Sequence, residues 1–231
     1  MPVAVITGAS RGLGRALATE LAQRRWDLVV DARNGDDLQR ATQEWEGRVI
    51  AIPGDIGEAD HRAQLAEAVD ELGRLDLLVN NASELGPSPQ PRLQNYPLDE
   101  LERVYRVNVF APLALAQLLL PELERAGGTI VNVSSDAAAE AYEGWGGYGT
   151  SKAALDHLSA ILAAEHPGLA VYAFDPGDMR TAMQQLAFPD EDISDRPEPR
   201  TVVPALLRLI EERPVSGRYS NADFLVKESS G

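Results

Sequence analysis

The chain has 231 residues, a formal net charge of −15 and no cysteine. This length fits one sizeable α/β core, and no stretch has the composition of an interdomain linker, so we expect a single domain over residues 1–231. The acidic balance argues against nucleic acid or an anionic membrane as a partner. The absence of cysteine excludes disulfides and thiol catalysis, and because the 3 histidines lack ligand spacing, we expect no metal site.

Short apolar runs alternate with helical patterns along the chain. Strands are expected at 3–7, 27–31, 49–52, 75–80, 129–133 and 170–174. Helices are expected at 13–24, 36–45, 60–72, 98–125, 151–165 and 202–212. Pro112 lies inside the fourth helical pattern and should kink it or mark a nearby boundary. Runs of Val, Ile and Leu joined by helices are typical of buried parallel strands, so the sequence predicts a doubly wound α/β fold, with a parallel sheet and helices on both faces.

Residues 1–6 lead directly into a strand-like run, so we expect no signal peptide at the beginning of the chain. We find no apolar stretch that approaches the roughly 20 residues of a membrane span. These observations predict a soluble, cytoplasmic protein.

A glycine-rich turn follows the first expected strand, with Gly8, Gly12 and Gly14 in the order Gly-x-x-x-Gly-x-Gly. Glycines let the backbone turn tightly and approach a pyrophosphate, and the N–H groups that open the next helix can hold phosphates. Glycine at such a turn can also be purely steric. Its place in the first strand–helix–strand unit favours a dinucleotide site of the Rossmann type.

The end of the second expected strand indicates which dinucleotide binds. An acidic side chain there would bind the ribose hydroxyls of NAD, whereas an arginine would pair with the 2′-phosphate of NADP. Asp31 lies near this point, but strand alternation should turn it away, and Arg33 follows in the loop. Arg11 in the glycine turn offers a second cation. We therefore expect NADP(H), with NAD(H) as the alternative if both arginines are only solvated loop charges.

Tyr148 and Lys152 form the most informative pair, because lysine occurs only at positions 152 and 227 and nearly every other cation is arginine. Residues four apart share a helix face, so the phenol and the ammonium can point into one cleft. A nearby cation favours the phenolate and lowers a tyrosine pKa from about 10. The pair is a candidate general acid and base, although the spacing can also arise by chance.

Taken together, these motifs resemble those of the short-chain dehydrogenase/reductase family, of the compact single-domain type, over nearly the whole chain. The acidic residue that follows the third strand in this family matches Asp55. The family's Asn-Asn-Ala-Gly motif matches 80–82 but meets Ser83 in place of glycine, which costs backbone freedom if φ is positive there. Residues 176–181 are similar to the family's Pro-Gly-x-x-x-Thr segment, which contacts nicotinamide.

The resemblance implies a catalytic set. The family's serine lies thirteen residues before the tyrosine, which selects Ser135 over Ser134, and its asparagine matches Asn108. It also implies that Tyr148 gives a proton to a carbonyl oxygen while NADPH delivers a hydride, that Lys152 lowers the tyrosine pKa and bonds the ribose, and that Asn108 holds a water. Its implied cofactor contacts are Gly8, Ser10, Arg11, Gly12, Leu13, Gly14, Arg33, Asp55, Ile56, Asn81, Ala82, Tyr148, Lys152, Pro176, Gly177, Met179 and Thr181.

The substrate is the least determined part, and we expect only a small carbonyl or alcohol. An apolar pocket could be lined by Tyr142, Trp145, Met179, Met183 and Phe188. Residues 178–200, with the acidic stretch 188–198, suggest a substrate lid or a mobile loop. A homodimer or homotetramer is the general default. Two other functions stay open: an NADP(H) sensor without turnover, and an epimerase or dehydratase, for which the chain seems short.

Overall fold

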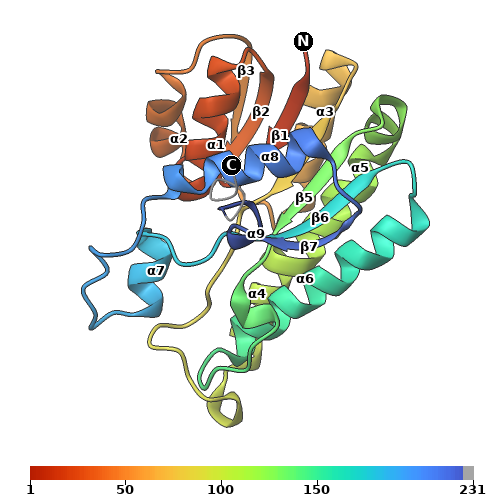
Figure 1. Cartoon of the computed structure of the whole chain (residues 1–231). Coiled ribbons are helices and arrows are strands. Elements are labelled where there is room, and N and C mark those ends of the chain that lie inside the picture. Colours follow the sequence, from red (N-terminus) through yellow and green to blue (C-terminus); the bar gives the residue numbers. More distant parts are fainter. Residues whose placement is uncertain (226–231) are drawn as a thin grey trace, which may run out of the picture.

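The computed structural model describes residues 1–225 as a seven-stranded sheet with helices on both faces (Figure 1). Its strands are β1 (Val3–Ile6), β2 (Asp27–Ala32), β3 (Val49–Pro53), β4 (Leu77–Asn80), β5 (Thr129–Val133), β6 (Ala170–Asp175) and β7 (Gly217–Ser220). The strand order is β3-β2-β1-β4-β5-β6-β7, and every neighbouring pair is parallel. The predicted doubly wound α/β fold is confirmed.

Two apolar cores lie on opposite faces of this sheet. One core joins the sheet to α1 (Gly12–Gln23), α2 (Gly35–Thr42) and α8 (Val203–Glu212), and the other joins it to α3 (Ala59–Leu72), α5 (Ala111–Ala126) and α6 (Gly146–Glu165). Alternation along the strands divides the side chains: Ala4 and Ile6 of β1 enter the first core, whereas Val3 and Val5 enter the second. Burial on both faces explains the continuous apolar runs in the sequence.

One long helix differs from expectation in its interior. It runs from Leu98 to Ala126 as α4 (Leu98–Tyr105), a π-helical turn (Arg106–Phe110) and α5. Pro112 sits in the first turn of α5, so the boundary that it predicted lies just before it. The helix also corrects the expectation about apolar length, because a window of it reaches a mean hydropathy of 1.3. It packs against α3 and the sheet, as a core helix does.

The C-terminal part contains three elements that the sequence pattern did not predict, α7 (Ala182–Ala187), β7 and α9 (Ala222–Leu225). After α7 and α8, the chain adds β7 at the edge of the sheet and ends its described part in the short helix α9. Lys227 lies outside the described residues. The helix that carries Tyr148 also begins earlier than expected, at Gly146, so both members of the Tyr-x-x-x-Lys pair lie on α6.

Candidate active site

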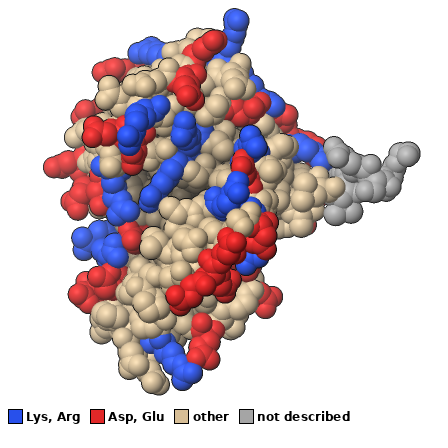
Figure 2. All heavy atoms as spheres, turned by 90° about the vertical axis from the view of Figure 1, so that its left-hand side faces the viewer, with Lys and Arg blue, Asp and Glu red and all other residues tan. Residues whose placement is uncertain are grey.

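A cleft of about 670 Å³ opens at the carboxyl ends of the strands, where a doubly wound sheet places its ligands. Its walls are the segments that follow β1, β2, β3, β4, β5 and β6, together with α6 and α7. Figure 2 shows one face of the molecule, on which basic side chains gather around a hollow. The arginines that border the cleft are Arg11, Arg33 and Arg180. The phosphate-binding and proton-transferring residues predicted from sequence therefore share one cavity.

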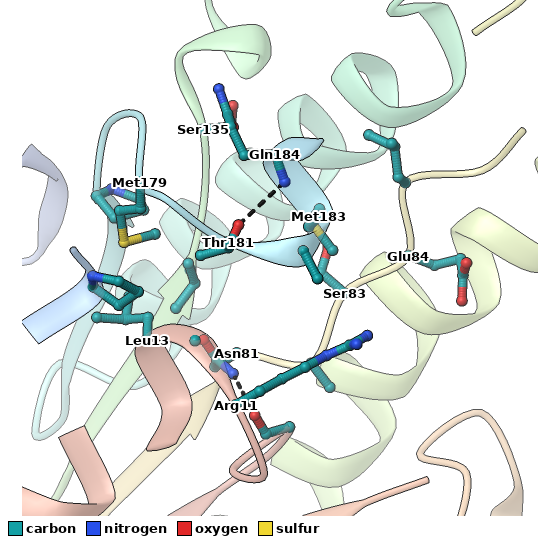
Figure 3. A pocket seen from close by; sticks show the side chains of 18 of the residues that line it. Arg11, Leu13, Asn81, Ser83, Glu84, Ser135, Met179, Thr181, Met183 and Gln184 are labelled. Carbon is teal, nitrogen blue, oxygen red and sulfur yellow. Dashed lines mark hydrogen bonds between the residues drawn. The ribbon is translucent and has the colours of Figure 1, made fainter. Parts of the chain in front are cut away.

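The glycine turn is built for close backbone approach. Gly8 and Gly12 have φ of +69° and +61°, a backbone conformation that residues with a side chain rarely adopt. Asn81 ties the turn to the end of β4, because its Nδ2 donates to the carbonyl oxygens of Thr7 at 2.8 Å and Gly8 at 3.2 Å (Figure 3). Among residues 1–225, no side chain caps the first turn of α1, whose N-cap is Arg11. Its N–H groups are thus available to an anion in the cleft.

At the end of β2 both Asp31 and Arg33 border the cleft, so strand alternation does not turn Asp31 away from it as expected. Asp31 is 2% exposed, accepts the N–H of Gly8 at 2.7 Å and lies 3.0 Å from Nε2 of His61. Both of its carboxylate oxygens are therefore used inside the fold. Arg33 borders the cleft, and its guanidinium bonds the Glu84 carboxylate at 3.0 Å. Glu84 also pairs with Arg103 at 3.0 Å, so it fixes one side of Arg33.

Tyr148 and Lys152 are both buried in the cleft wall on one face of α6. The ammonium lies 5.5 Å from the centre of the phenol ring, and Nζ donates to the carbonyl oxygen of Val133 at 2.7 Å. Burial lowers the pKa of Lys152 to about 8. Burial also raises the pKa of Tyr148 to about 12. The hydroxyls of Ser83 and Ser135 act in the opposite direction and lower this pKa. The expectation that Lys152 lowers the tyrosine pKa is therefore not met. Loss of hydration has the largest effect on this pKa, and the groups that lower it are the serine hydroxyls, not the lysine.

Ser135 is the second residue after β5 and borders the same cleft. Its Oγ donates to Asp136 at 2.9 Å and accepts the N–H of Ala137 at 3.2 Å, so it caps a short 3-10 turn (Asp136–Ala138). Its hydroxyl lowers the pKa of Tyr148, against the larger effect of burial. Ser134 is 2% exposed, and its hydroxyl has no partner among the described residues. Ser135 and Tyr148 both border the cleft, and the catalytic role that the resemblance gives to Ser135 stays a prediction.

Asn108 sits in the π-helical turn, 1% exposed, behind the wall of the cleft. Its Oδ1 accepts the Ser83 hydroxyl at 3.1 Å and the Glu84 N–H at 2.8 Å. Its Nδ2 donates to the Glu84 carbonyl at 2.9 Å and to Ser151 Oγ at 2.9 Å. All the hydrogen-bonding capacity of the amide is used to join the loop after β4 to α6.

Ser83 does not carry the backbone strain that was considered for it, since the only non-glycine residues with positive φ in the described chain are Arg25 and Arg213. Sequence reasoning missed the role of Ser83 in the hydrogen-bond network, and it missed Glu84 altogether. The departure from the family's Asn-Asn-Ala-Gly motif was the available signal for Ser83. Glu84 had none, because its contacts are made by its backbone and by arginines distant in sequence.

Most of the predicted cofactor and catalytic residues border the cleft. Those that do are Gly8, Ser10, Arg11, Gly12, Leu13, Arg33, Asp55, Ile56, Asn81, Ala82, Ser135, Tyr148, Lys152, Pro176, Gly177, Met179 and Thr181. Gly14 and Asn108 lie just behind this lining. A Cβ on Gly14 would lie 2.5 Å from Asn81 Nδ2 and 2.6 Å from the Gly8 carbonyl oxygen, so this glycine supports the turn from below.

Part of the segment 178–200 forms one wall of the cleft. Thr181 caps α7 by accepting the N–H of Gln184 at 3.1 Å (Figure 3). Met179, Met183 and Trp145 border the cleft, as the predicted apolar pocket requires. Tyr142 and Phe188 do not: the Tyr142 hydroxyl donates to Asp136 at 3.0 Å, and Phe188 packs on Trp145 with ring centres 5.7 Å apart. Opening or closing of this segment stays a prediction.

The comparisons with known proteins agree with this geometry. The family model described as short chain dehydrogenase matches residues 2–192. The chain belongs to this family. Sepiapterin reductase of Bos taurus is 36% identical over 199 residues, covering 79% of this chain and 74% of the relative. The 7alpha-hydroxysteroid dehydrogenase of Escherichia coli K12 is 33% identical over 195 residues, covering 81% and 75%.

A solved structure adds a cofactor-bound neighbour for this short-chain dehydrogenase. The short chain dehydrogenase of Shigella flexneri 2a, complexed with NADP, superposes with a TM-score of 0.87 at 28% identity, covering 96% of this chain and 97% of the neighbour. The protein is thus an oxidoreductase enzyme with the Rossmann-like fold of its family.

Proposed function

We propose that this short-chain dehydrogenase reduces a small carbonyl compound with NADPH, with Tyr148 as the proton donor. The observation that carries the proposal is the placement of Tyr148, Ser135 and Lys152 in one cleft with the uncapped start of α1. A phosphate-binding helix terminus beside a proton donor suits a dinucleotide that reacts with a second molecule bound next to it.

The residues present fit a nicotinamide dinucleotide. Gly8 and Gly12 have backbone conformations suited to a glycine turn beneath a pyrophosphate, and the first N–H groups of α1 would hold its oxygens. Asp55 and Ile56 border the cleft after β3, and Met179 and Thr181 border it after β6. When bound, the cofactor supplies the hydride. The protein supplies position and proton chemistry.

The preference for NADP(H) rests on the end of β2. Asp31 uses both carboxylate oxygens within the fold, on Gly8 and His61, so it is poorly placed to bind ribose hydroxyls. Arg33 and Arg11 border the cleft and would pair with a 2′-phosphate. NAD(H) remains the alternative cofactor. The NADP-bound Shigella neighbour supports this preference by similarity.

Tyr148 would act as a general acid during reduction. With a pKa of about 12 the phenol carries its proton at neutral pH, and that proton passes to the carbonyl oxygen. Ser135 donates a hydrogen bond to the oxygen as negative charge develops there. Lys152, anchored on Val133, would hold the ribose and stabilise the phenolate left behind, and the buried Asn108 would keep α6 in register.

We infer a small, partly apolar substrate, because Leu85, Trp145, Met179 and Met183 border the cleft. The curated relatives named above are a sepiapterin reductase and a hydroxysteroid dehydrogenase. We also propose closure of 178–200 over the substrate, a cytoplasmic location, and a homodimer or homotetramer.

The test is NADPH oxidation, followed by absorbance, against a panel of ketones, aldehydes and quinones. The proposal expects turnover of at least one class and a higher kcat/KM with NADPH than with NADH. A protein that binds NADPH tightly and reduces nothing across the panel would instead be a sensor of the cofactor.

A further inference from the structure

We propose that Arg218, on the edge strand β7, is a positioning residue that holds Ser135 in place against α6, the helix of Tyr148 and Lys152. This inference rests on the proposed function, because it assigns Arg218 to the step in which Ser135 stabilises the developing charge. The observation that carries it is a single guanidinium that bonds α6, Ser135 and the end of β6, all of which border the cleft.

The fold directs the Arg218 side chain toward α6. β7 pairs with β6 at the edge of the sheet, and Arg218 lies opposite Ala173 (Figure 1). The next residue, Tyr219, packs on the other face of the sheet, against Tyr172 and Phe224. Because successive side chains of a strand alternate between the faces, Arg218 reaches the face that α6 covers.

The guanidinium of Arg218 makes three hydrogen bonds on this face. Its Nε donates to Asp156 Oδ2 at 3.0 Å, and Nη2 donates to the Ser135 carbonyl oxygen at 2.9 Å and to Asp175 Oδ2 at 3.0 Å. The side chains of Asp156 and Asp175 are only 17% and 11% exposed. Charge-assisted hydrogen bonds are stronger than neutral ones, and the planar fork of an arginine holds its partners in a fixed geometry.

Asp156 connects Arg218 to the helix of the tyrosine–lysine pair. It lies four residues after Lys152 on α6, so both side chains share one face of the helix. Burial lowers the pKa of Lys152, and the charge of Asp156 opposes this effect. Lys152 itself donates to the carbonyl oxygen of Val133, two residues before Ser135. The segment after β5 is therefore tied to α6 both by Lys152 and by Arg218.

Asp175 connects Arg218 to the turn after β6. It is the last residue of β6, and its Oδ1 accepts the N–H of Gly177 at 3.0 Å. Gly177 has a φ of +72° and borders the cleft. Without the guanidinium, the carboxylates of Asp156 and Asp175 would lose their shared cation and repel each other. Ser135 would lose a donor to its carbonyl oxygen and shift relative to α6.

The bond to Ser135 is made through the main chain, so it fixes the residue without using its hydroxyl. That hydroxyl stabilises charge on the substrate oxygen only if it lies within hydrogen-bond distance of it. The glycine turn follows β1 and Arg33 follows β2, whereas Arg218 bonds segments beside β5 and β6. Loss of Arg218 should therefore lower kcat far more than it weakens cofactor binding.

The decisive experiment measures kcat, KM and NADPH affinity for wild type, Arg218→Ala and Arg218→Lys. Arg218→Ala should lower kcat roughly 10- to 100-fold, because a shift of about 1 Å in a positioned group can cost this much. The dissociation constant of NADPH should stay within about threefold. Arg218→Lys keeps the charge between the carboxylates but lacks the fork, and it should lower kcat roughly 3- to 10-fold.

Chemical rescue separates positioning from a structural role. Free guanidinium, added below the concentrations that unfold proteins, can occupy the space left in Arg218→Ala and bond the same three partners. It should restore part of the lost kcat, whereas urea, which has a similar shape and no charge, should restore none. Wild type in the same solutions corrects for any general effect of either compound.

Arg208→Ala is the matched control, because the Arg208 side chain is 33% exposed against 36% for Arg218 and bonds Glu212 and the Phe224 carbonyl outside the cleft. It should keep the wild-type kcat. Thermal unfolding identifies any loss of folding, and Arg218→Lys provides the second test if Arg218→Ala is unstable.

Two results would overturn the role of Arg218 alone: a folded Arg218 variant with the wild-type kcat, or a loss of kcat in Arg218→Ala that guanidinium does not restore. A wild type without turnover would instead overturn the proposed function, and the role of Arg218 with it.

Discussion

At the scale of single residues, burial decides the charge states in this site. Tyr148 and Lys152 both lose hydration in the wall of the cleft, and the loss favours the neutral form of each. The hydroxyls of Ser83 and Ser135 oppose this effect on the tyrosine. The protein therefore holds a protonated phenol at neutral pH, as a proton donor in carbonyl reduction must be.

Arg33→Ala should weaken NADPH binding roughly 10- to 100-fold and leave NADH binding nearly unchanged, because the guanidinium would pair with a phosphate that NADH lacks. Titration with both cofactors measures this difference. Arg48→Ala, an exposed arginine outside the cleft, is the control. An equal loss for both cofactors would refute the assignment of Arg33 to the 2′-phosphate.

The sequence was sufficient for residues whose role depends on spacing along one element. Tyr148 and Lys152 share a helix face, and Ser135 follows a strand, so fixed intervals bring them together. Spacing along one element could not predict the contacts that form between different elements. The Ser83–Asn108 bond depends on where the π-helical turn places the amide, and the Arg33–Glu84 pair depends on how two loops meet.

At the scale of elements, the glycine turn shows how close packing constrains sequence. Gly14→Ala should lower the free energy of unfolding by about 1 to 3 kcal/mol, because its Cβ would overlap the Gly8 carbonyl and the Asn81 amide. It should also weaken NADPH binding, since both neighbours shape the turn. Chemical denaturation and cofactor titration check the two effects.

Gly168→Ala is the matched control for this change, since a Cβ there meets nothing within 4 Å and its φ is not positive. The packing account of the turn is wrong if Gly14→Ala unfolds and binds NADPH like the control.

At the scale of the whole molecule, the buried lysine makes stability depend on pH. The folded pKa of Lys152, about 8, lies below the 10.5 of an exposed lysine, so the unfolded chain binds more protons between these values. Its contribution therefore raises the free energy of unfolding as pH increases from 8, by at most about 1.4 kcal/mol per unit. Relative to Lys152→Met, the wild type should gain stability between pH 8 and 9.5 in denaturant titrations. A constant difference across this range would show that Lys152 does not titrate there.

The overall architecture was predictable because parallel strands buried on both faces leave short apolar runs, and these runs alternate with longer helical patterns along the chain. The edge strand β7 left no such run, as it reads Gly-Arg-Tyr-Ser. Its place is set by pairing with β6, for example Phe174 with Tyr219, and not by its own pattern. The π-helical turn escaped prediction for a similar reason, since its residues are ordinary helix residues in sequence.

The most direct test of the central claim is Tyr148→Phe, measured for both NADPH binding and NADPH turnover with a carbonyl that the wild type reduces. The substitution removes one oxygen atom and keeps the ring that packs on Trp145. We predict unchanged cofactor affinity within about twofold and a loss of kcat of roughly 100-fold or more. Turnover that survives at the wild-type rate would contradict the account, because another group would then be donating the proton.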